Sequence, residues 1–516
     1  MKRRALFVSS LVLLFCAASV SAQTLGAVLT PSQETPACSG TGFGNATVTF
    51  DSTRQNVNAT ITVANLNSPI TGFHIHEAPL GQAGNIILNF QGLGGTFSNG
   101  KMTGTFPIAA DVAQRMLQNP SNFYVNVHTS QCPGGAARGQ LAFANGGPVM
   151  YFADLRGSNE TPPNSSTAFG AGLVTFDPFN NTMAFDVATN GIASPTASHI
   201  HSGASGGAGG VLINFATGPS GFTNGRVAGF GPLSGSMVTS SLQPSDLTNL
   251  ATATTAANYY VNVHSTAFPG GEIRGQLAPA QEFDIPVAGH VTNGIGQTFI
   301  SDVRIFNPSF TSSADALVEF FQAGTSPNTT PTTSMVVSLP VRGTSVLNDI
   351  AGSSGLNITG VGAIRITSAV PVIATSRIFV NSNNGSFGQF VPAFSRSQAL
   401  QHGAMPQVSN TSAANGFRSN LGFFNPDVNP VTVRIEARDA AGNSLGSNTI
   451  TLQPLTQQQN GLATYFPGID LSNTANATVT FDASAPIFVY VSEVDNTSGD
   501  SFLVPAQSDP GVAANQ

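Results

Sequence analysis

Six of the eight histidines of this chain fall within its first 280 residues, in two sets of three. Each set has a His-x-His pair, followed later by a third histidine that ends a Tyr-Val-Asn-Val-His segment. Imidazole nitrogen is a ligand that suits both copper and zinc. The spacing therefore predicts a candidate copper or zinc site in each set: His74, His76 and His128, and then His199, His201 and His264.

The residues that alternate with the histidines predict which way the imidazoles point. Phe73 and Ile75 are apolar, so on a strand they face the core and turn the first His-x-His pair to the opposite face. Val125 and Val127 are apolar as well, so they should face the core and leave His128 on the opposite face of its strand. Histidines without a metal are also common on polar strand faces, and a duplication copies structural residues as faithfully as functional ones. Metal binding is therefore a hypothesis beside that plainer interpretation.

The two histidine sets belong to a longer internal repeat. Five motifs occur twice in the same order, which defines two domains at about residues 24–146 and 148–280. The matching segments are Ser32–Pro36 and Ser158–Pro162, Val48–Asp51 and Val174–Asp177, His74–His76 and His199–His201, Tyr124–His128 and Tyr260–His264, and Pro133–Leu141 and Pro269–Leu277.

A different repeat fills the rest of the chain. Phe299–Pro308 matches Phe417–Pro426, and this match defines units at about residues 283–396 and 400–508. They resemble immunoglobulin-like sandwiches in pattern only, and we find no nucleophile motif or acidic cation loop in them. We expect no catalytic or cofactor-binding residues in this half or in the first 280 residues, where the histidines are candidate metal ligands only.

The apolar pattern predicts an all-β protein. Ala46, Val48 and Phe50 alternate with polar neighbours, as half-buried antiparallel strands require. Many short strands in units of this length indicate tandem Greek-key or immunoglobulin-like β-sandwiches or flattened barrels. Short helices are expected at Ala110–Leu117 and at Ser245–Leu250, with Ser245 or Asp246 as the N-cap.

Composition and the N-terminus predict an exported protein. Residues 1–22 have a basic start, an apolar stretch and small residues before Ala22, as in a cleaved signal peptide. No later segment is apolar for long enough to span a bilayer. The net charge of −7, with charged residues at only 8%, argues against nucleic-acid partners. We expect a secreted chain, in the extracellular space, at the cell surface or in the periplasm.

Two cysteines remain after the signal segment, Cys38 and Cys132. In the repeat they fall opposite Asn164 and Phe268, so both are present in one domain and both are absent from the other. Partners in one bond should be gained or lost together, which favours a disulfide in an oxidising compartment. The alternative is a pair of free, partly buried thiols.

Two further residue types recur in both domains. Glu34 and Glu160 each precede Thr-Pro, which is typical of a turn or cap residue rather than of a ligand or acid catalyst. Arg138 and Arg274 lie near the domain ends, where we expect them to tie strand ends to carbonyls or carboxylates.

The motifs around the histidines, together with the closing Pro-Gly-Gly-x-x-Arg-Gly-Gln-Leu, resemble the CHRD domain, named from chordin. The resemblance covers about residues 24–280 and implies a β fold and an extracellular location. The family has no securely assigned activity, and chordin itself binds growth factors. The resemblance therefore favours a secreted, non-enzymatic protein that binds an extracellular protein or glycan, with copper or zinc binding as the alternative.

A weaker resemblance is to copper/zinc superoxide dismutase. Gly72–Glu77 is similar to the first copper-ligand strand of that enzyme, Val127–His128 to the strand of its last copper ligand, and Arg138 to its guiding arginine. No histidine lies between His76 and His128, so the bridging histidine and the zinc ligands are missing. A dismutase-like enzyme is therefore the last-ranked hypothesis.

Overall fold

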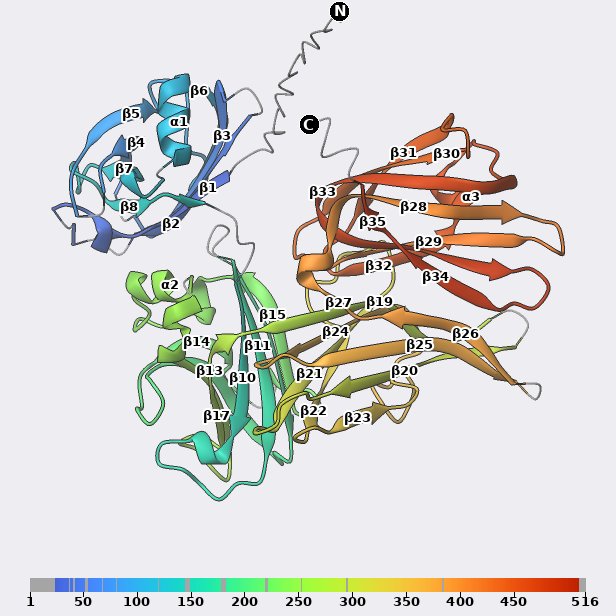
Figure 1. Ribbon diagram of the computed structural model, residues 1–516. Coiled ribbons are helices and arrows are strands. Elements are labelled where there is room, and N and C mark those ends of the chain that lie inside the picture. The colour runs from blue at the N-terminus through green and yellow to red at the C-terminus, as the bar shows by residue number, and fades with distance from the viewer. Residues whose placement is uncertain are drawn as a thin grey trace, which may run out of the picture.

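The computed structural model describes residues 24–509 except 37, 40–41, 52–53, 67, 80, 119, 144–148, 178–181, 219–220, 252, 294–295 and 383–384. The signal segment expected at residues 1–22 lies outside this part of the chain. The described residues form antiparallel sheets with few short helices (Figure 1), which confirms the all-β prediction. Within them, no helix combines the length and apolar character needed to cross a membrane.

The first domain, residues 24–143, is a sandwich of two sheets with strand orders β6-β3-β2-β1-β9 and β5-β4-β7-β8. A bridge between Thr30 and Arg138 joins the two sheets at one edge. The elements are β1 Thr24–Leu29, η1 Pro31–Gln33, β2 Phe43–Phe50, β3 Asn56–Ala64, β4 Ile70–Glu77, β5 Asn85–Asn89, β6 Lys101–Pro107, α1 Ala110–Gln118, η2 Pro120–Asn122, β7 Phe123–Thr129, β8 Ala137–Gln140 and β9 Ala142–Phe143.

The second domain, residues 149–279, repeats this plan as one continuous sheet of order β14-β13-β16-β17-β10-β11-β12-β15, with β18 beside β10. The elements are β10 Val149–Arg156, η3 Gly157–Asn159, β11 Phe169–Asp177, β12 Thr182–Asn190, β13 Pro195–Ser202, β14 Val211–Ala216, β15 Arg226–Pro232, η5 Gly235–Met237, α2 Pro244–Leu250, η6 Ala253–Asn258, β16 Tyr259–Ser265, β17 Ile273–Gln276 and β18 Ala278–Pro279.

Both expected helices are present, but the predicted cap of the second is wrong. Helix α2 begins at Pro244, and its N-cap is Gln243 rather than Ser245 or Asp246. Asp246 instead occupies the third helical position, where its carboxylate accepts the backbone N–H of Gln243 at 2.8 Å. The proline fits the first turn because its missing N–H would have no partner inside the helix.

The two C-terminal repeat units are also sandwiches, residues 281–398 and 400–508. The first comprises β19 Gln281–Thr292, β20 Thr298–Phe306, β21 Ala314–Gln322, β22 Thr333–Leu339, β23 Thr344–Leu347, β24 Gly360–Ser368, β25 Ile373–Ser382, β26 Gly385–Pro392, β27 Phe394–Ser395 and η7 Arg396–Gln398. The second comprises β28 Leu400–Thr411, β29 Phe417–Asn425, β30 Val431–Arg438, β31 Ser444–Leu452, β32 Thr456–Gly461, α3 Leu462–Tyr465, β33 Asn473–Asp495, β34 Ser501–Pro505 and β35 Gln507–Ser508.

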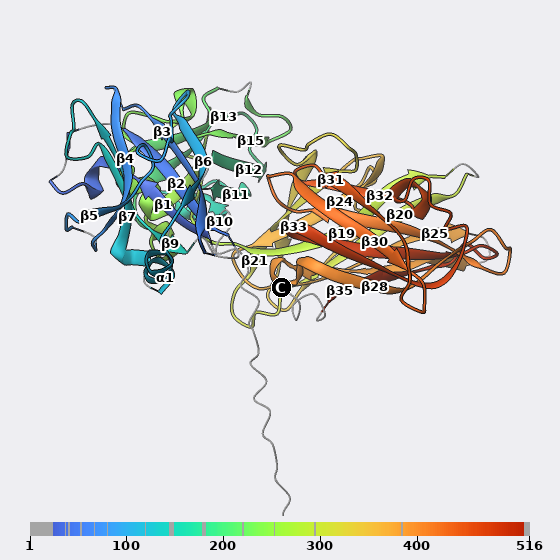
Figure 2. The ribbon, with the colours of Figure 1, turned by 90° about the horizontal axis from the view of Figure 1, so that it is seen from above.

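Figure 2 shows the two N-terminal domains on one side of the molecule and both repeat units on the other. The second domain contacts the first repeat unit through a small apolar cluster, in which Phe152 and Leu173 pack with Leu317 of β21. Arg156 reinforces this contact with an ion pair to the fully buried Asp315 at 2.6 Å. The outer face of the β10–β11–β12 sheet is therefore an internal interface.

The equivalent face of the first domain is polar rather than apolar. Strand pairing places Gly26 and Thr47 where the second domain has Phe152 and Leu173. Around them lies a set of hydroxyl and amide side chains that are hydrogen-bonded from strand to strand: Thr24 with Thr49, Thr60 with Thr103, and Thr105 with Asn58. We call this set the threonine face.

Candidate metal centre

The three imidazoles of each predicted set meet on the sheet that contains β4 and β7, or β13 and β16. In the first domain β4 pairs with β7, so that His74 lies opposite Asn126 and Gly72 lies opposite His128. One nitrogen from each ring of a set lies within 4.8 Å of the others, in both domains. The strands thus bring each His-x-His pair together with a third histidine that is distant in the sequence, and they do so twice.

Backbone carbonyls fix the orientation of two rings in each set. Nδ1 of His76 donates to the carbonyl of Gly84 at 2.9 Å, and Nδ1 of His128 donates to that of Pro133 at 2.9 Å. A carbonyl only accepts, so the proton sits on Nδ1 and the lone pair on Nε2 is free for a metal. The second domain repeats both contacts, His201 with Gly209 at 3.0 Å and His264 with Pro269 at 2.9 Å.

One nitrogen of each ring is buried and has no hydrogen-bond partner among the described residues. These nitrogens are Nδ1 of His74 and Nε2 of His76 and His128, with the equivalent atoms of His199, His201 and His264. A buried polar atom without a partner costs free energy. Zinc–nitrogen bonds of about 2.0–2.1 Å place the ligands of one ion no farther than roughly 4.2 Å apart. The nitrogens of each set lie within 4.8 Å of one another, slightly above this limit, so a small rotation of the rings would bring them into range of an ion, and the all-imidazole donor set suits copper or zinc.

The electrostatics also favour neutral, metal-ready imidazoles. Burial, helped by the neighbouring His128 and His76, lowers the pKa of His74 to about 4. Burial and the two neighbouring imidazoles likewise lower the pKa of His199 to about 4. The pKa of His76 is also lowered, mainly by burial. A metal binds the neutral ring, so protons compete weakly for this site near neutral pH.

A tyrosine and an arginine support the site from behind. The ring of His76 stacks on Tyr124 at a centroid distance of 4.8 Å, and the Arg138 guanidinium lies 3.5 Å from the centroid of the same tyrosine. Arg138 donates to the carbonyls of Gln82 and Pro79 at 2.7 and 3.0 Å. It therefore holds the loop that presents the Gly84 carbonyl to His76, as the sequence led us to expect of an arginine that ties backbone carbonyls.

The second domain repeats this support. His201 stacks on Tyr260 at 4.9 Å, and Arg274 donates to the carbonyls of Gly207 and Ala204. Both arginines are only 1% exposed, so they are positioned to shape the loop rather than to attract an anion from solvent. Sequence reasoning missed both tyrosines and the carbonyl partners, although the tyrosines begin the repeated Tyr-Val-Asn-Val-His segment.

Glu34 lies beside the histidines but outside the ligand set. Its carboxyl is buried, and Asn126 donates to it at 3.3 Å. Burial raises the pKa of Glu34 to about 8, and that of Glu160 in the second domain to about 7. A protonated carboxyl and an amide can exchange two hydrogen bonds, which fits the otherwise unpartnered Oε1 of Glu34 and Oδ1 of Asn126. Glu34 also ends η1 as its C-cap residue, so the expected cap role holds for its backbone.

A disulfide closes the first domain beside this site. Cys38 and Cys132 are bonded, with a Cα–Cα distance of 6.1 Å, which confirms the prediction from the repeat. The second domain uses hydrogen bonds instead, because Asn164 donates to the carbonyls of Gly271 and Glu272 at 3.1 and 3.0 Å. The two domains thus fasten the same turn by different chemistry.

Comparisons with known proteins agree with the repeat. The family model of the CHRD domain matches residues 25–141 and 151–277. No curated protein matches the chain. Among solved structures, the crystal structure of Thermotoga maritima 1070 aligns at 12% identity over 22% of this chain and 97% of its own, with a TM-score of 0.18, too low to carry an argument.

Proposed function

Because two tandem CHRD domains occupy residues 25–141 and 151–277, we propose that this chain is an exported binding protein that holds one copper or zinc ion in each of them. CHRD domains are generally binding modules rather than enzymes. The observation that carries the proposal is the convergence of three unpartnered imidazole nitrogens in each domain, with two of the three rings oriented by carbonyls.

Copper is the favoured ion. Imidazole sites follow the general affinity order in which copper(II) exceeds zinc and nickel. Three protein ligands also leave a coordination position for water or for a group from a partner. An extracellular protein or glycan could bind there or elsewhere on the β surfaces, and this partner is part of the same proposal. Export is supported by the disulfide, which persists in oxidising compartments.

Calorimetric titration of the metal-free chain with copper and zinc at neutral pH tests the metal proposal. We expect two ions per chain, with copper bound more tightly. His128→Ala should remove one ion and leave the other site intact, and His264→Ala should do the converse. Loss of one ligand should weaken a site by more than about 100-fold, because second-shell changes alone cost about 10–100-fold.

His402→Ala is the matched control, since His402 pairs with Asp482 in the second repeat unit and belongs to neither set. Metal binding that is unchanged in a variant lacking all six histidines would show that the imidazoles are structural.

A further inference from the structure

A cavity of about 550 Å³ lies between the two repeat units, within the range of small-molecule sites. Val287 of β19 and Ile378 of β25 line it from the first unit. Strands β29, β32, β33 and β34 of the second unit form the opposite wall. None of the six clustered histidines is among the described residues that line it, so the cavity is separate from the metal centres.

The second unit presents one face of its sheet to the first unit, and this face changes from apolar to polar along the strands. Phe424 and Phe488 lie opposite each other in the pairing of β29 with β33, and they pack in an apolar cluster with Phe321 of the first unit. Four residues earlier in β29, and so on the same face, Asn420 lies opposite Ser492. Both line the cavity, which therefore occupies the polar end of the interface.

Three amide side chains line the cavity with NH₂ groups that have no partner. Ser492 donates to Oε1 of Gln389 at 3.0 Å, and Tyr490 donates to Oε1 of Gln459 at 2.8 Å. Both amide oxygens are thus engaged, whereas neither Nε2 has a hydrogen-bond partner among the described residues. The side chain of Asn420 makes no hydrogen bond at all within this part of the chain. An amide NH₂ only donates, so a matching ligand offers acceptor oxygens.

Two phenylalanines of the first unit supply the apolar part of the lining. The rings of Phe299 and Phe387 meet edge to face at a centroid distance of 6.4 Å, and both residues are half-buried. Neither belongs to the hydrophobic core cluster of that unit, and both line the cavity. A sugar ring has a face of C–H groups that packs on an aromatic ring, and oxygens at its edge that accept hydrogen bonds. The lining therefore matches a saccharide.

The charges of the lining disfavour an ionic ligand. Among the described residues that line the cavity none is acidic, so an organic cation would have no counter-ion there. Arg418 is the single cation among them, and its guanidinium is exposed and already donates to Asn496 at 3.1 Å.

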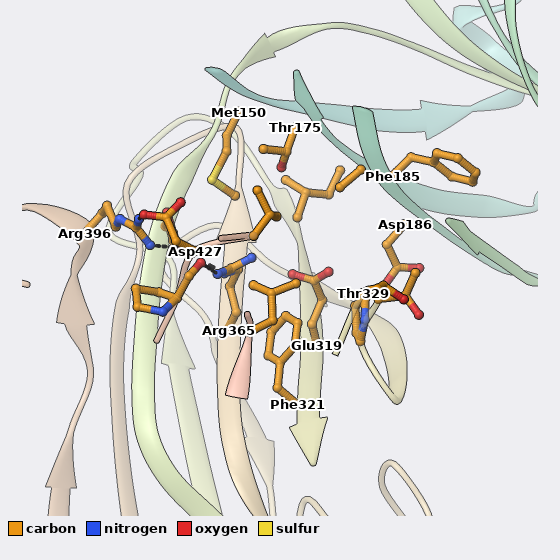
Figure 3. A pocket seen from close by; sticks show the side chains of 18 of the residues that line it. Met150, Thr175, Phe185, Asp186, Glu319, Phe321, Thr329, Arg365, Arg396 and Asp427 are labelled. Atoms are coloured by element: carbon orange, nitrogen blue, oxygen red, sulfur yellow. Dashed lines mark hydrogen bonds and ion pairs between the residues drawn. The ribbon is translucent and has the colours of Figure 1, made fainter. Parts of the chain in front are cut away.

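The hollow where the second domain meets the repeat units has a different lining. Its charged side chains contact one another, as Figure 3 shows for Arg396 and Asp427, which are 2.7 Å apart. Asp186 and Glu319 share a hydrogen bond in the same hollow. These groups have partners within the protein, so the unpartnered amides point to the cavity between the repeat units instead.

We propose that the cavity between the repeat units binds a short, neutral, N-acetylated saccharide, with its acetamido and hydroxyl oxygens on Gln389, Asn420 and Gln459 and a sugar ring on Phe299 and Phe387. The acetamido carbonyl only accepts, which matches amide groups that only donate. This proposal rests on the proposed function in one respect, the glycan partner, to which it gives a site and a chemical class.

Calorimetric titration of the full exported chain with N,N′-diacetylchitobiose tests the proposal, with cellobiose as the probe of the same frame without acetamido groups. We expect saturable binding of diacetylchitobiose, and binding of cellobiose that is weaker by about tenfold, as lost hydrogen bonds imply. Asn420→Leu keeps the size of the side chain and breaks no hydrogen bond among the described residues. It should weaken binding about tenfold. Asn473→Leu, at an exposed asparagine of β33 outside the cavity, is the matched control and should leave binding unchanged.

A second variant blocks the cavity by size. Ser501→Trp introduces an indole from a half-buried position in the lining and should abolish saccharide binding while leaving copper binding intact. Copper titration of the same samples distinguishes a failure of this proposal from a failure of the metal proposal. The saccharide proposal is wrong if diacetylchitobiose does not bind saturably, if cellobiose binds equally well, or if either cavity variant binds the saccharide like the unaltered chain.

Discussion

Backbone carbonyls orient two of the three imidazoles in each histidine set. In His76 and His128, the Nδ1–H donates a hydrogen bond to a backbone carbonyl. The proton of the neutral ring is therefore on Nδ1, and Nε2 has none. The sequence was sufficient to place these histidines together, because period-two alternation sets the side of each strand. It could not show the carbonyls of Gly84 and Pro133, since backbone groups leave no mark in a residue pattern.

The lowered pKa values give the metal-free protein a defined acid sensitivity. His74 and His199 have folded-state pKa values of about 4, below the ordinary histidine value of 6.5. The unfolded chain therefore takes up protons first, and stability should fall as pH drops from about 6.5 toward 4. Urea unfolding across this range measures the effect. A double His74→Ala, His199→Ala variant should show a shallower fall, and an identical slope would contradict the assignment.

Glu34 should act in the opposite direction. Its folded-state pKa of about 8 lies above the ordinary glutamate value of 4.5, so between these values the folded state holds a proton that the unfolded state has lost. Its contribution to stability is complete below pH 4.5 and declines as pH rises to 8. Glu34→Gln mimics the neutral acid and should gain stability relative to the unaltered protein as pH rises from 5 to 9, measured by thermal unfolding. A difference that does not change with pH would argue for an ionised Glu34.

Between elements, one arginine connects the loop after β4 to the strands that bear the ligands. Arg138→Lys retains the charge but loses the planar fork that reaches the Gln82 and Pro79 carbonyls. We expect roughly 10–100-fold weaker metal binding in the first domain, typical of lost second-shell support, with the second domain unchanged. Arg115→Lys, at a partly exposed ion pair with Glu77, is the control for calorimetry.

The disulfide offers a second comparison at this scale. It closes a loop with a sequence separation of 94, for which chain entropy predicts roughly 4–5 kcal/mol of stabilisation. Reduction should therefore destabilise the first domain by about that amount and leave the second unaffected. In the second domain, Asn164→Ala should cost about 1–3 kcal/mol, because two buried carbonyls lose their donor. Unfolding of the two domains followed separately by hydrogen exchange distinguishes these effects.

Alternation predicted strands well where each strand has one buried face, as for Val48 and Phe50, which are at most 1% exposed. Prediction from the sequence was wrong at the N-terminus of α2, where local hydrogen bonds determine which residue is the N-cap. Gln243 caps α2, although serine and aspartate are the usual caps, because Asp246 completes the box from inside the helix. The contact between Asp186 and Glu319 could not be predicted either, since these two carboxyl groups meet only when two sequence units dock.

At the level of the whole molecule, the docking of the second domain changes what its isolated fragment should do. The repeat predicts that residues 24–146 and 148–280 each fold by themselves, because each contains its own full set of motifs, and we keep that prediction for the first fragment. The second would expose Phe152 and Leu173, which pack against Leu317 in the full chain. We expect fragment 148–280 to self-associate in light scattering, whereas 148–508 is monomeric. A monomeric 148–280 fragment would show that this face needs no cover.

The threonine face differs from the equivalent face of the second domain, which packs on the first repeat unit. The first repeat unit offers one receiving surface around Leu317, and the second domain already covers it. If the first domain carried Phe and Leu where it has Gly26 and Thr47, two identical faces would compete for that surface. The domain that is not docked could then bind the first repeat unit of another chain. Each chain added in this way would again have one undocked apolar face, as in any head-to-tail contact that does not close. Gly26 and Thr47 in place of those apolar groups leave the first domain without a face that matches the surface around Leu317, so the duplication does not create a second competitor for it.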